Sequence, residues 1–421
     1  MSDREADRAE ILAMIEAEKD RIVAFFRDFV AIPSPNPPGD TTAAVRFITD
    51  FLEAEGAPWR LVAPQRDMPN VVGAVEGGAP GRNLVLNGHV DVFPVSDDPE
   101  AEGWTADPWG GELRDGAVYG RGAADMKAGT SASIWTYVLL SRIRDRLKGR
   151  LTLTCVSDEE TFGPWGARWL MEHEPEVRGD CCLNGEPSSP FSVRFGEKGP
   201  LWLTFTVRTP GAHGAYTHAS PSATRLAMKL IEDLESLEDL EFPMPDNLMR
   251  AQIEGREATD RAMGPGAADV LPKVTLNIGT IRGGLKNNMI PQSCVFEADI
   301  RLPVGVSRAQ VMEEVEKIAA RHPEASFVED RCNEPSWCDP YGEMMEIIQD
   351  NVESLGRPRP TPIVSIGGTD ARLWRYEGVP AYVYGPFPTG MGSFDENVPV
   401  EDFLHVVRTH ALSAYDYLMR S

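Results

Sequence analysis

The chain has 421 residues, which is longer than one hydrophobic core normally organises, so we expect two domains. A composition of 42% hydrophobic and 25% charged residues is typical of a folded globular protein and excludes a disordered or collagen-like chain. The 65 acidic residues outnumber the 41 basic ones and give a formal net charge of -24. Because that charge repels nucleic acids and anionic membranes, neither is an expected partner.

The sequence also indicates a compartment. The first residues, MSDREADRAEILAMIEAEKD, are charged and lack the apolar core of a signal peptide, and no apolar run is long enough to span a membrane. The six cysteines are scattered without the spacing of a zinc finger. We therefore expect a cytoplasmic protein whose cysteines are free thiols.

In the first half of the chain, helix-like and strand-like segments alternate. Apolar residues recur with a helical period over 7–30, and the proline-rich loop IPSPNPPGD ends that pattern. The segments that follow are a helix over 42–56, strands over 70–77 and 83–93, a helix over 125–143 and a strand over 151–160. Such alternation predicts an α/β sheet.

The pattern changes after Glu197. Strands over 201–210, 273–284 and 293–303 surround a helix over 222–237, and a further helix follows near 307–321. This β-α-β-β-α order predicts a separate α+β module, inserted into a domain whose alternation resumes near residue 340. We place the discontinuous α/β domain at 1–195 and 310–421 and the inserted module at 196–309.

Acidic residues and one histidine gather where the predicted strands end. They are His89 and Asp91 in GHVDVFP, Asp125 after a glycine turn, the run Asp158, Glu159 and Glu160, and Glu186 in LNGEPSS. Each of these has a simpler explanation when it is taken alone. The pair His89 and Asp91 could be a structural hydrogen bond and Asp125 a helix cap, while the acidic run could be a solvated turn and Glu186 a loop residue. Together, imidazole and carboxylate ligands at the carboxyl edge of an α/β sheet favour a divalent transition metal such as Zn²⁺, Mn²⁺ or Co²⁺.

These motifs resemble a known family. The run GHVDVFP, DPWGG, DGAVYGRGAADMKAG, DEE and GEPSS is similar to the metallopeptidases and aminoacylases that include acetylornithine deacetylase, succinyl-diaminopimelate desuccinylase and glutamate carboxypeptidase. The resemblance covers nearly the whole chain. It implies a mixed-sheet, metallopeptidase-like catalytic domain of the α/β class with an inserted α+β dimerisation (lid) domain, and hence a homodimer or higher homo-oligomer.

The resemblance also implies roles for single residues. His89 and Glu186 match ligands of a first metal ion, Asp125 a bridging ligand and Glu160 a ligand of a second ion. Asp91 matches the acid that orients the histidine, and Glu159 the general base. This agrees with the chemistry, because a metal lowers the pKa of bound water and a neighbouring glutamate takes its proton.

Further residues match the parts of the family that contact substrate. In GAHGAYTHASPSATR, His213 resembles the histidine that crosses to the neighbouring subunit's site, although His218 lies close to it. Asn288 in KNNMIP resembles an asparagine that contacts the substrate or oxyanion, and Arg372 in GGTDAR resembles a clamp for a substrate carboxylate. A turn histidine and a surface arginine are the alternatives for His213 and Arg372.

One position departs from the family pattern. The family closes its second metal site with a histidine four residues before a glutamate, and if that glutamate is Glu396, the histidine position is Gly392. His405 and His410 lie on the last predicted helix and fit that register poorly, whereas Asp395, Ser393 or a water remain as substitutes. We therefore expect one tightly held ion per chain rather than two.

These features predict a metal-dependent hydrolase that cleaves a C–N bond, most simply the amide of an N-acyl amino acid or small peptide bearing a free carboxylate. The lost histidine leaves open a hydrolytic deaminase of a small, anthranilate-like aromatic amino-carboxylate that uses one ion. A third alternative is a catalytically dead binding protein, against which the intact Glu159 argues.

Overall fold

The computed structural model describes residues 3–420, and its chain divides into two compact units. The first comprises residues up to Phe195, Cys338–Ile363 and Thr369 onward, and the second comprises Gly196–Trp337 and Val364–Gly368. The chain passes between them four times: within β8 (Ser192–Glu197), after β15 (Ser336–Trp337), within β16 (Thr361–Ser365) and after Gly368.

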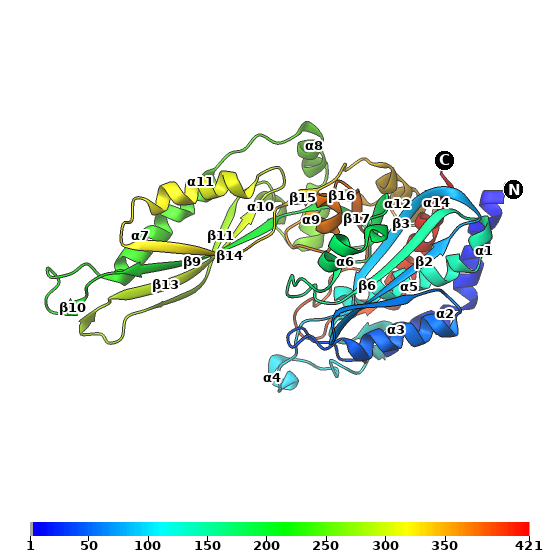
Figure 1. Ribbon diagram of the computed structural model, residues 1–421, viewed down its shortest axis with the longest axis horizontal. Helices are drawn as coiled ribbons and strands as arrows, with labels where there is room; N and C mark the ends of the chain where they lie inside the picture. Colours follow the sequence, from blue (N-terminus) through cyan, green and yellow to red (C-terminus); the bar gives the residue numbers. More distant parts are fainter. Residues whose placement is uncertain (1–2, 421) are drawn as a thin grey trace. The chain divides into compact units, whose positions relative to one another are not determined.

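The first unit is built on a mixed sheet (Figure 1). Its strands follow the order β1 (Arg60–Gln65), β2 (Met68–Glu76), β6 (Lys148–Val156), β3 (Ala79–His89), β7 (Cys181–Asn184), β17 (Ala381–Val383) and β8. The central neighbours β6, β3, β7 and β17 run parallel, and the outer pairs are antiparallel. The parallel strands are buried on both faces, so that in LTLTCV of β6 the leucines and the alternating threonines are all buried.

Helices cover this sheet. Buried α5 (Ala128–Ser141) and α14 (Val400–Met419) pack on each other and on β3 and β6, while α6 (Ala167–His173) and α13 (Ala371–Tyr376) join a separate apolar cluster with strand residues such as Val85 and Val156. The other helices are α1 (Asp3–Ala17), α2 (Lys19–Val30), α3 (Thr42–Ala54), α4 (Pro99–Glu102) and α12 (Glu343–Ser354). A small sheet has the order β18 (Asn397–Pro399), β5 (Ala117–Tyr119) and β4 (Glu112–Arg114).

The second unit is an antiparallel sheet with helices on one face (Figure 1). The strand order is β11 (Thr275–Gly283), β13 (Ser293–Leu302), β9 (Gly199–Arg208) and β14 (Ala325–Cys332), and α7 (Ala223–Leu234) and α11 (Arg308–Ala319) cover it. The connection from α7 to β11 carries α8 (Asp246–Glu254), α9 (Arg256–Met263) and α10 (Ala267–Val270). A short ribbon of β10 (Ala212–His213) and β12 (Met289–Ile290) completes the unit.

The mixed α/β fold with an inserted α+β unit confirms the predicted fold class. The second unit, however, runs to Trp337, beyond the predicted end at residue 309. The reason is that β14 pairs with β9 along nearly its whole length and α11 packs on α7, so β14 and α11 both belong to the inserted unit. All six cysteines are free, as predicted. Among residues 3–420, no helix has both the length and the apolar character needed to cross a membrane.

Candidate metal centre

The strand register of the first unit brings together side chains that are far apart in the sequence. In the parallel pairing of β3 with β7, Asn87 lies opposite Asn184, and the two amides are joined by a 2.7 Å hydrogen bond. His89 lies two residues beyond Asn87, and Glu186 lies two residues beyond Asn184. The distance between His89 Nε2 and Glu186 Oε1 is 3.3 Å. Because parallel strands present their carboxyl ends at one edge, this edge collects the predicted site residues.

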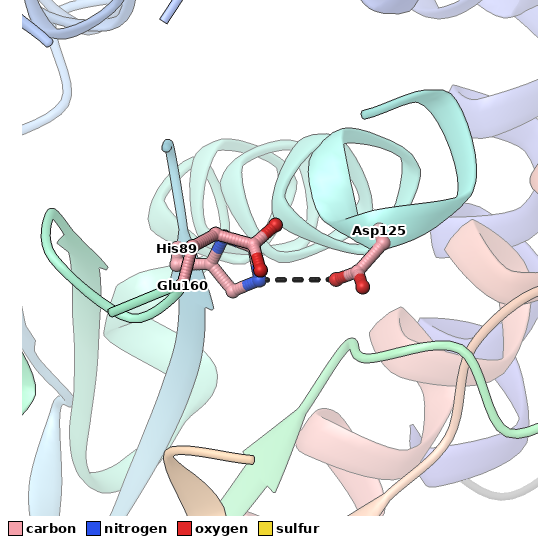
Figure 2. Close-up of side chains that lie close together, drawn as sticks. All are labelled: His89, Asp125 and Glu160. Carbon is pink, nitrogen blue, oxygen red and sulfur yellow. Dashed lines mark hydrogen bonds and ion pairs between the residues drawn. The ribbon is translucent and has the colours of Figure 1, made fainter. Parts of the chain in front are cut away.

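Asp125 reaches the same point from the start of a helix. Gly122 has a φ of +79°, a left-handed conformation that favours glycine, and Asp125 keeps non-helical angles before α5 begins. Its Oδ1 lies 3.2 Å from His89 Nε2, the contact drawn in Figure 2. A Cβ on Gly129 would stand 1.8 Å from the carbonyl oxygen of Gly185, so a glycine there lets α5 approach the loop that carries Glu186.

The acidic turn after β6 completes the cluster. His89, Asp125 and Glu160 have ligand atoms within 4.8 Å of one another, and so do His89, Glu159 and Glu186. Figure 2 shows the Glu160 carboxylate beside the His89 ring, opposite Asp125. The structure thus brings together five of the predicted residues: His89, Asp125, Glu159, Glu160 and Glu186.

The electrostatics of this cluster are those of a site for a cation. Burial, followed by repulsion from Asp125, raises the pKa of Glu186 to about 7 and that of Glu160 well above its usual value. Burial and then Asp370 likewise raise the pKa of Glu159. Burial opposes a charge on His89, but the surrounding carboxylates, led by Glu186, outweigh it and raise its pKa. Buried carboxylates that repel one another are stabilised by a positive ion.

Two further observations fit a bound metal. Among residues 3–420, Glu160 Oε1 is buried without a hydrogen-bond partner. His89 Nδ1 lies 2.8 Å from the carbonyl oxygen of Asp91, which makes Nδ1 the donor and leaves Nε2 available as a ligand. One imidazole nitrogen with several carboxylate oxygens is a donor set suited to Zn²⁺, Mn²⁺ or Co²⁺.

Asp91 differs from the geometry expected from sequence. The resemblance implied that its carboxylate orients His89, but that carboxylate is 3.6 Å from Nδ1, and the backbone carbonyl of Asp91 makes the hydrogen bond. The Asp91 carboxylate instead accepts the backbone N–H groups of Glu159 at 3.3 Å and Glu160 at 3.1 Å. It thus holds the acidic turn.

Arg372 lies beside the cluster and is 3% exposed, which excludes the surface arginine that we considered. Its Nη1 is 3.4 Å from Glu159 Oε1 and also donates to the carbonyl of Thr369. Its guanidinium carbon stands 4.9 Å from the Phe162 ring centroid.

His213 and Asn288 belong to the second unit, where the structure places them on neighbouring segments. The Gly214 N–H donates to the Asn288 carbonyl at 2.7 Å, and both His213 and Asn288 are exposed.

The C-terminal loop carries the positions that we considered as replacements for the missing histidine. Gly392 has a φ of +70°, and a Cβ built on it would stand 3.7 Å from the ring of Phe93. The Asp395 carboxylate accepts the hydroxyl of Thr105 at 2.7 Å and its backbone N–H at 2.8 Å. Ser393 is exposed, and Asp395 is in no cluster of histidine, cysteine and carboxylate ligand atoms among residues 3–420.

Sequence reasoning missed several residues at this site. Asn36 donates its side-chain amide to Asp91 at 2.9 Å. Burial raises the pKa of Asp370 to about 6, and the positive charge of Arg372 opposes that rise. In the sequence, Glu396 served only to locate the position of the missing histidine, yet its carboxylate accepts the backbone N–H of Asp125 at 3.0 Å. The proline-rich loop around Asn36 and the GGTDAR motif were visible signals, but no local pattern in the sequence assigns these contacts.

Comparisons with known proteins agree with this geometry. The family model described as peptidase family M20/M25/M40 matches residues 85–416. A succinyl-diaminopimelate desuccinylase of Cereibacter sphaeroides is 31% identical over 389 residues, covering 90% of this chain and 94% of the relative.

Two solved structures share the fold. An M20 family metallo-carboxypeptidase from Sulfolobus solfataricus has a TM-score of 0.79 at 16% identity, covering 96% of this chain and 99% of the other. A dinuclear metal-binding peptidase of the M20 family from Bacillus subtilis has a TM-score of 0.68 at 17% identity, covering 96% and 99%.

The fold and the buried cluster define a metal-dependent hydrolase that acts on amide bonds. The chain belongs to peptidase family M20/M25/M40. Its substrate is a small molecule, and the family uses divalent metal ions.

Proposed function

We propose that this enzyme holds one divalent ion tightly and hydrolyses the amide of an N-acyl amino acid or small peptide that carries a free carboxylate. The observation that carries the proposal is the position of His89 Nε2, 3.2 Å from Asp125 and 3.3 Å from Glu186 in a buried, strongly acidic cluster. Zn²⁺, Mn²⁺ and Co²⁺ all accept these ligands.

His89, Asp125 and Glu186 are the proposed ligands of the tight ion, and Glu160 with Asp125 offers a weaker second position. When bound, the ion would polarise the substrate carbonyl and make water a stronger acid. A carboxylate oxygen of Glu159 takes the proton of the attacking water and delivers it to the departing nitrogen. Asp91 keeps Glu159 in place, since its carboxylate accepts the Glu159 backbone N–H.

A carboxylate-bearing substrate requires a positive partner. We assign this task to Arg372, whose planar guanidinium suits two parallel hydrogen bonds. The contact between Arg372 and Glu159 links the substrate clamp to the base. His213 and Asn288 are the proposed contacts to the polarised carbonyl oxygen, contributed by the second unit of a partner in a homodimer.

The proposal of one ion depends on the C-terminal loop. Gly392 has no side chain to contribute, and Asp395 already binds the Thr105 hydroxyl and backbone. With His89 assigned to the tight ion, the cluster found among residues 3–420 leaves the oxygens of Asp125 and Glu160 for the second position, which then lacks the imidazole nitrogen that Zn²⁺ commonly takes. The relative from Bacillus subtilis, by contrast, is described as dinuclear.

The same loop favours a second candidate function, the hydrolytic deamination of a small aromatic amino-carboxylate. The Phe93 ring, 38% exposed, borders the position that a side chain at Gly392 would occupy, so an aromatic surface stands where the family resemblance implies a histidine ligand. An attack on an activated ring requires one activated water and does not require two ions at a carbonyl.

Metal analysis and kinetics test the proposal together. After dialysis, we expect one ion per chain in the wild type, and His89→Ala should lose it because it removes the nitrogen ligand. Glu159→Gln should retain the ion while kcat falls by about 100-fold or more. Glu76→Gln, at a glutamate whose side chain is 70% exposed in the same unit, is the matched control and should behave as wild type.

Three results would contradict these assignments. Two firmly bound ions in the wild type would refute the single-ion proposal, and full activity in Glu159→Gln would remove the base. Substrates should include N-succinyl and N-acetyl amino acids beside aromatic amino-carboxylates. Turnover of the aromatic compounds alone would replace the first candidate function with the second.

A further inference from the structure

Glu396 is a buried carboxylate with an unusually complete set of donors. It is 1% exposed, and its Oε2 accepts Arg121 Nη1 at 2.8 Å and the backbone N–H of Gly122 at 3.2 Å. Its Oε1 accepts the backbone N–H groups of Ala124 at 2.8 Å and Asp125 at 3.0 Å. A carboxylate offers about four lone-pair positions, so these contacts leave none for a metal ion.

All four donors lie in the segment that leads into Asp125. This segment is irregular, with a left-handed Gly122 and non-helical angles at Asp125, so regular α-helical geometry does not fix the direction of the Asp125 side chain. Glu396 supplies that constraint from a part of the chain 271 residues away. Charge-assisted hydrogen bonds to backbone N–H groups are among the stronger polar contacts in proteins.

The surrounding contacts make the constraint rigid. The Gly120 N–H donates to the Glu396 carbonyl at 2.9 Å, and β18, which begins at the next residue, pairs with β5. On the other side of Asp125, Lys127 Nζ donates to the carbonyl oxygens of Phe29 at 3.0 Å and Ile32 at 2.6 Å. The backbone of Asp125 is therefore held on both sides.

We infer that Glu396 is a positioning residue that sets the metal affinity of the site through the backbone of Asp125, without binding the ion itself. This inference rests on the proposed function, because it requires that Asp125 be a ligand. It also gives the C-terminal loop a task in this chain although Gly392 offers no ligand.

The variant Glu396→Gln tests the inference with little change in shape. The glutamine amide has one acceptor oxygen, so its NH₂ group must face either Arg121 and Gly122 or Ala124 and Asp125, where only donors meet it. The Asp125 backbone should then shift. Partners that orient metal ligands typically contribute about 10- to 100-fold to metal affinity, and we expect a loss of that size.

The measurement is the dissociation constant for Mn²⁺ and for Zn²⁺, obtained by calorimetry on the metal-depleted full chain well below its unfolding temperature. Asp395→Asn is the matched control, because it perturbs the neighbouring anchor to Thr105 without touching residues 121–125. A positioning role predicts weaker metal binding in Glu396→Gln only, with kcat returning to within a few-fold of wild type at saturating metal.

Unchanged metal affinity in Glu396→Gln would overturn the inference and leave the proposed function intact. Equal weakening in Glu396→Gln and Asp395→Asn would also overturn it, since a general loosening of the loop would then suffice. A wild type that binds neither ion would instead overturn the proposed function.

If Glu396→Gln does not fold, Glu396→Asp replaces it, because that variant keeps the charge beside Arg121 but withdraws the oxygens from Ala124 and Asp125. Wild-type affinity in Glu396→Asp would count against the inference, and a loss of about tenfold or more would support it.

Discussion

The two histidines of the last helix predict how the stability of this protein depends on acid. His405 and His410 are buried on α14, where His405 Nε2 lies 2.9 Å from the hydroxyl of Tyr384 and His410 Nε2 lies 2.7 Å from its carbonyl oxygen. Because a carbonyl only accepts, His410 carries its proton on Nε2. Protonating Nδ1 as well would place a charged donor where, among residues 3–420, that nitrogen has no partner.

The size of this loss of stability in acid follows from the pKa values of His405 and His410. Burial, followed by Arg357 and Arg408, lowers the pKa of His405 to about 3, and burial lowers that of His410 to about 4 against its hydrogen bond to Tyr384. The unfolded chain, with histidine pKa values of about 6.5, binds more protons than the folded chain between these limits. The contribution of the two neutral histidines to the unfolding free energy is therefore fully present above pH 6.5, and it is lost as the pH falls from there toward the folded-state pKa values. At pH 5 the loss is about 2 kcal/mol for each histidine and about 4 kcal/mol for the pair.

The assay is urea unfolding at pH 8 and pH 5, followed by circular dichroism. In the double variant His405→Gln and His410→Gln, the decrease in unfolding free energy between these pH values should be smaller by about 4 kcal/mol, because neutral amides replace both imidazoles. His173→Gln, at an exposed histidine of the same unit, is the matched control. An undiminished decrease in the double variant would refute the reasoning.

Two further predictions concern the site. Gly392→His should not restore a second ion, because its φ of +70° costs a side chain about 1–2 kcal/mol and the Phe93 ring stands beside it; elemental analysis returning two ions would contradict this. His213→Ala should lose activity and keep its metal if the second unit of a partner completes the site. Mixing inactive His213→Ala and Glu159→Gln chains should then restore up to about a quarter of wild-type activity, since half the dimers are mixed and half their sites are intact. No recovery after demonstrated subunit exchange would confine His213 to its own chain.

The metal cluster was predictable because its signals are local. Each ligand follows directly on an apolar strand or a glycine turn, as with His89 after NLVLNG and Glu186 after CCLN. Parallel strands must present their carboxyl ends at one edge, so a sequence that shows several such ends implies that their side chains meet. The missing histidine at Gly392 was visible in the same way, by its spacing from Glu396.

The extent of the inserted unit was harder to predict. The strand β14 resembles any strand of the first unit in its local pattern. Only its pairing with β9, more than a hundred residues earlier in the chain, assigns it to the second sheet. Strand pairing is a long-range choice that local periodicity does not encode.

By itself, the sequence determined the class of chemistry, since ligand types and strand ends are local properties, and it determined the α/β order that gathers them. The tertiary structure decided what the polar residues around the ligands do. The Asp91 carboxylate holds the acidic turn while its backbone carbonyl orients His89, Glu396 holds the backbone of Asp125, and His405 and His410 bind Tyr384 in the core. The physical reason is that a buried polar group must find partners wherever the fold supplies them, and those partners come from distant parts of the chain.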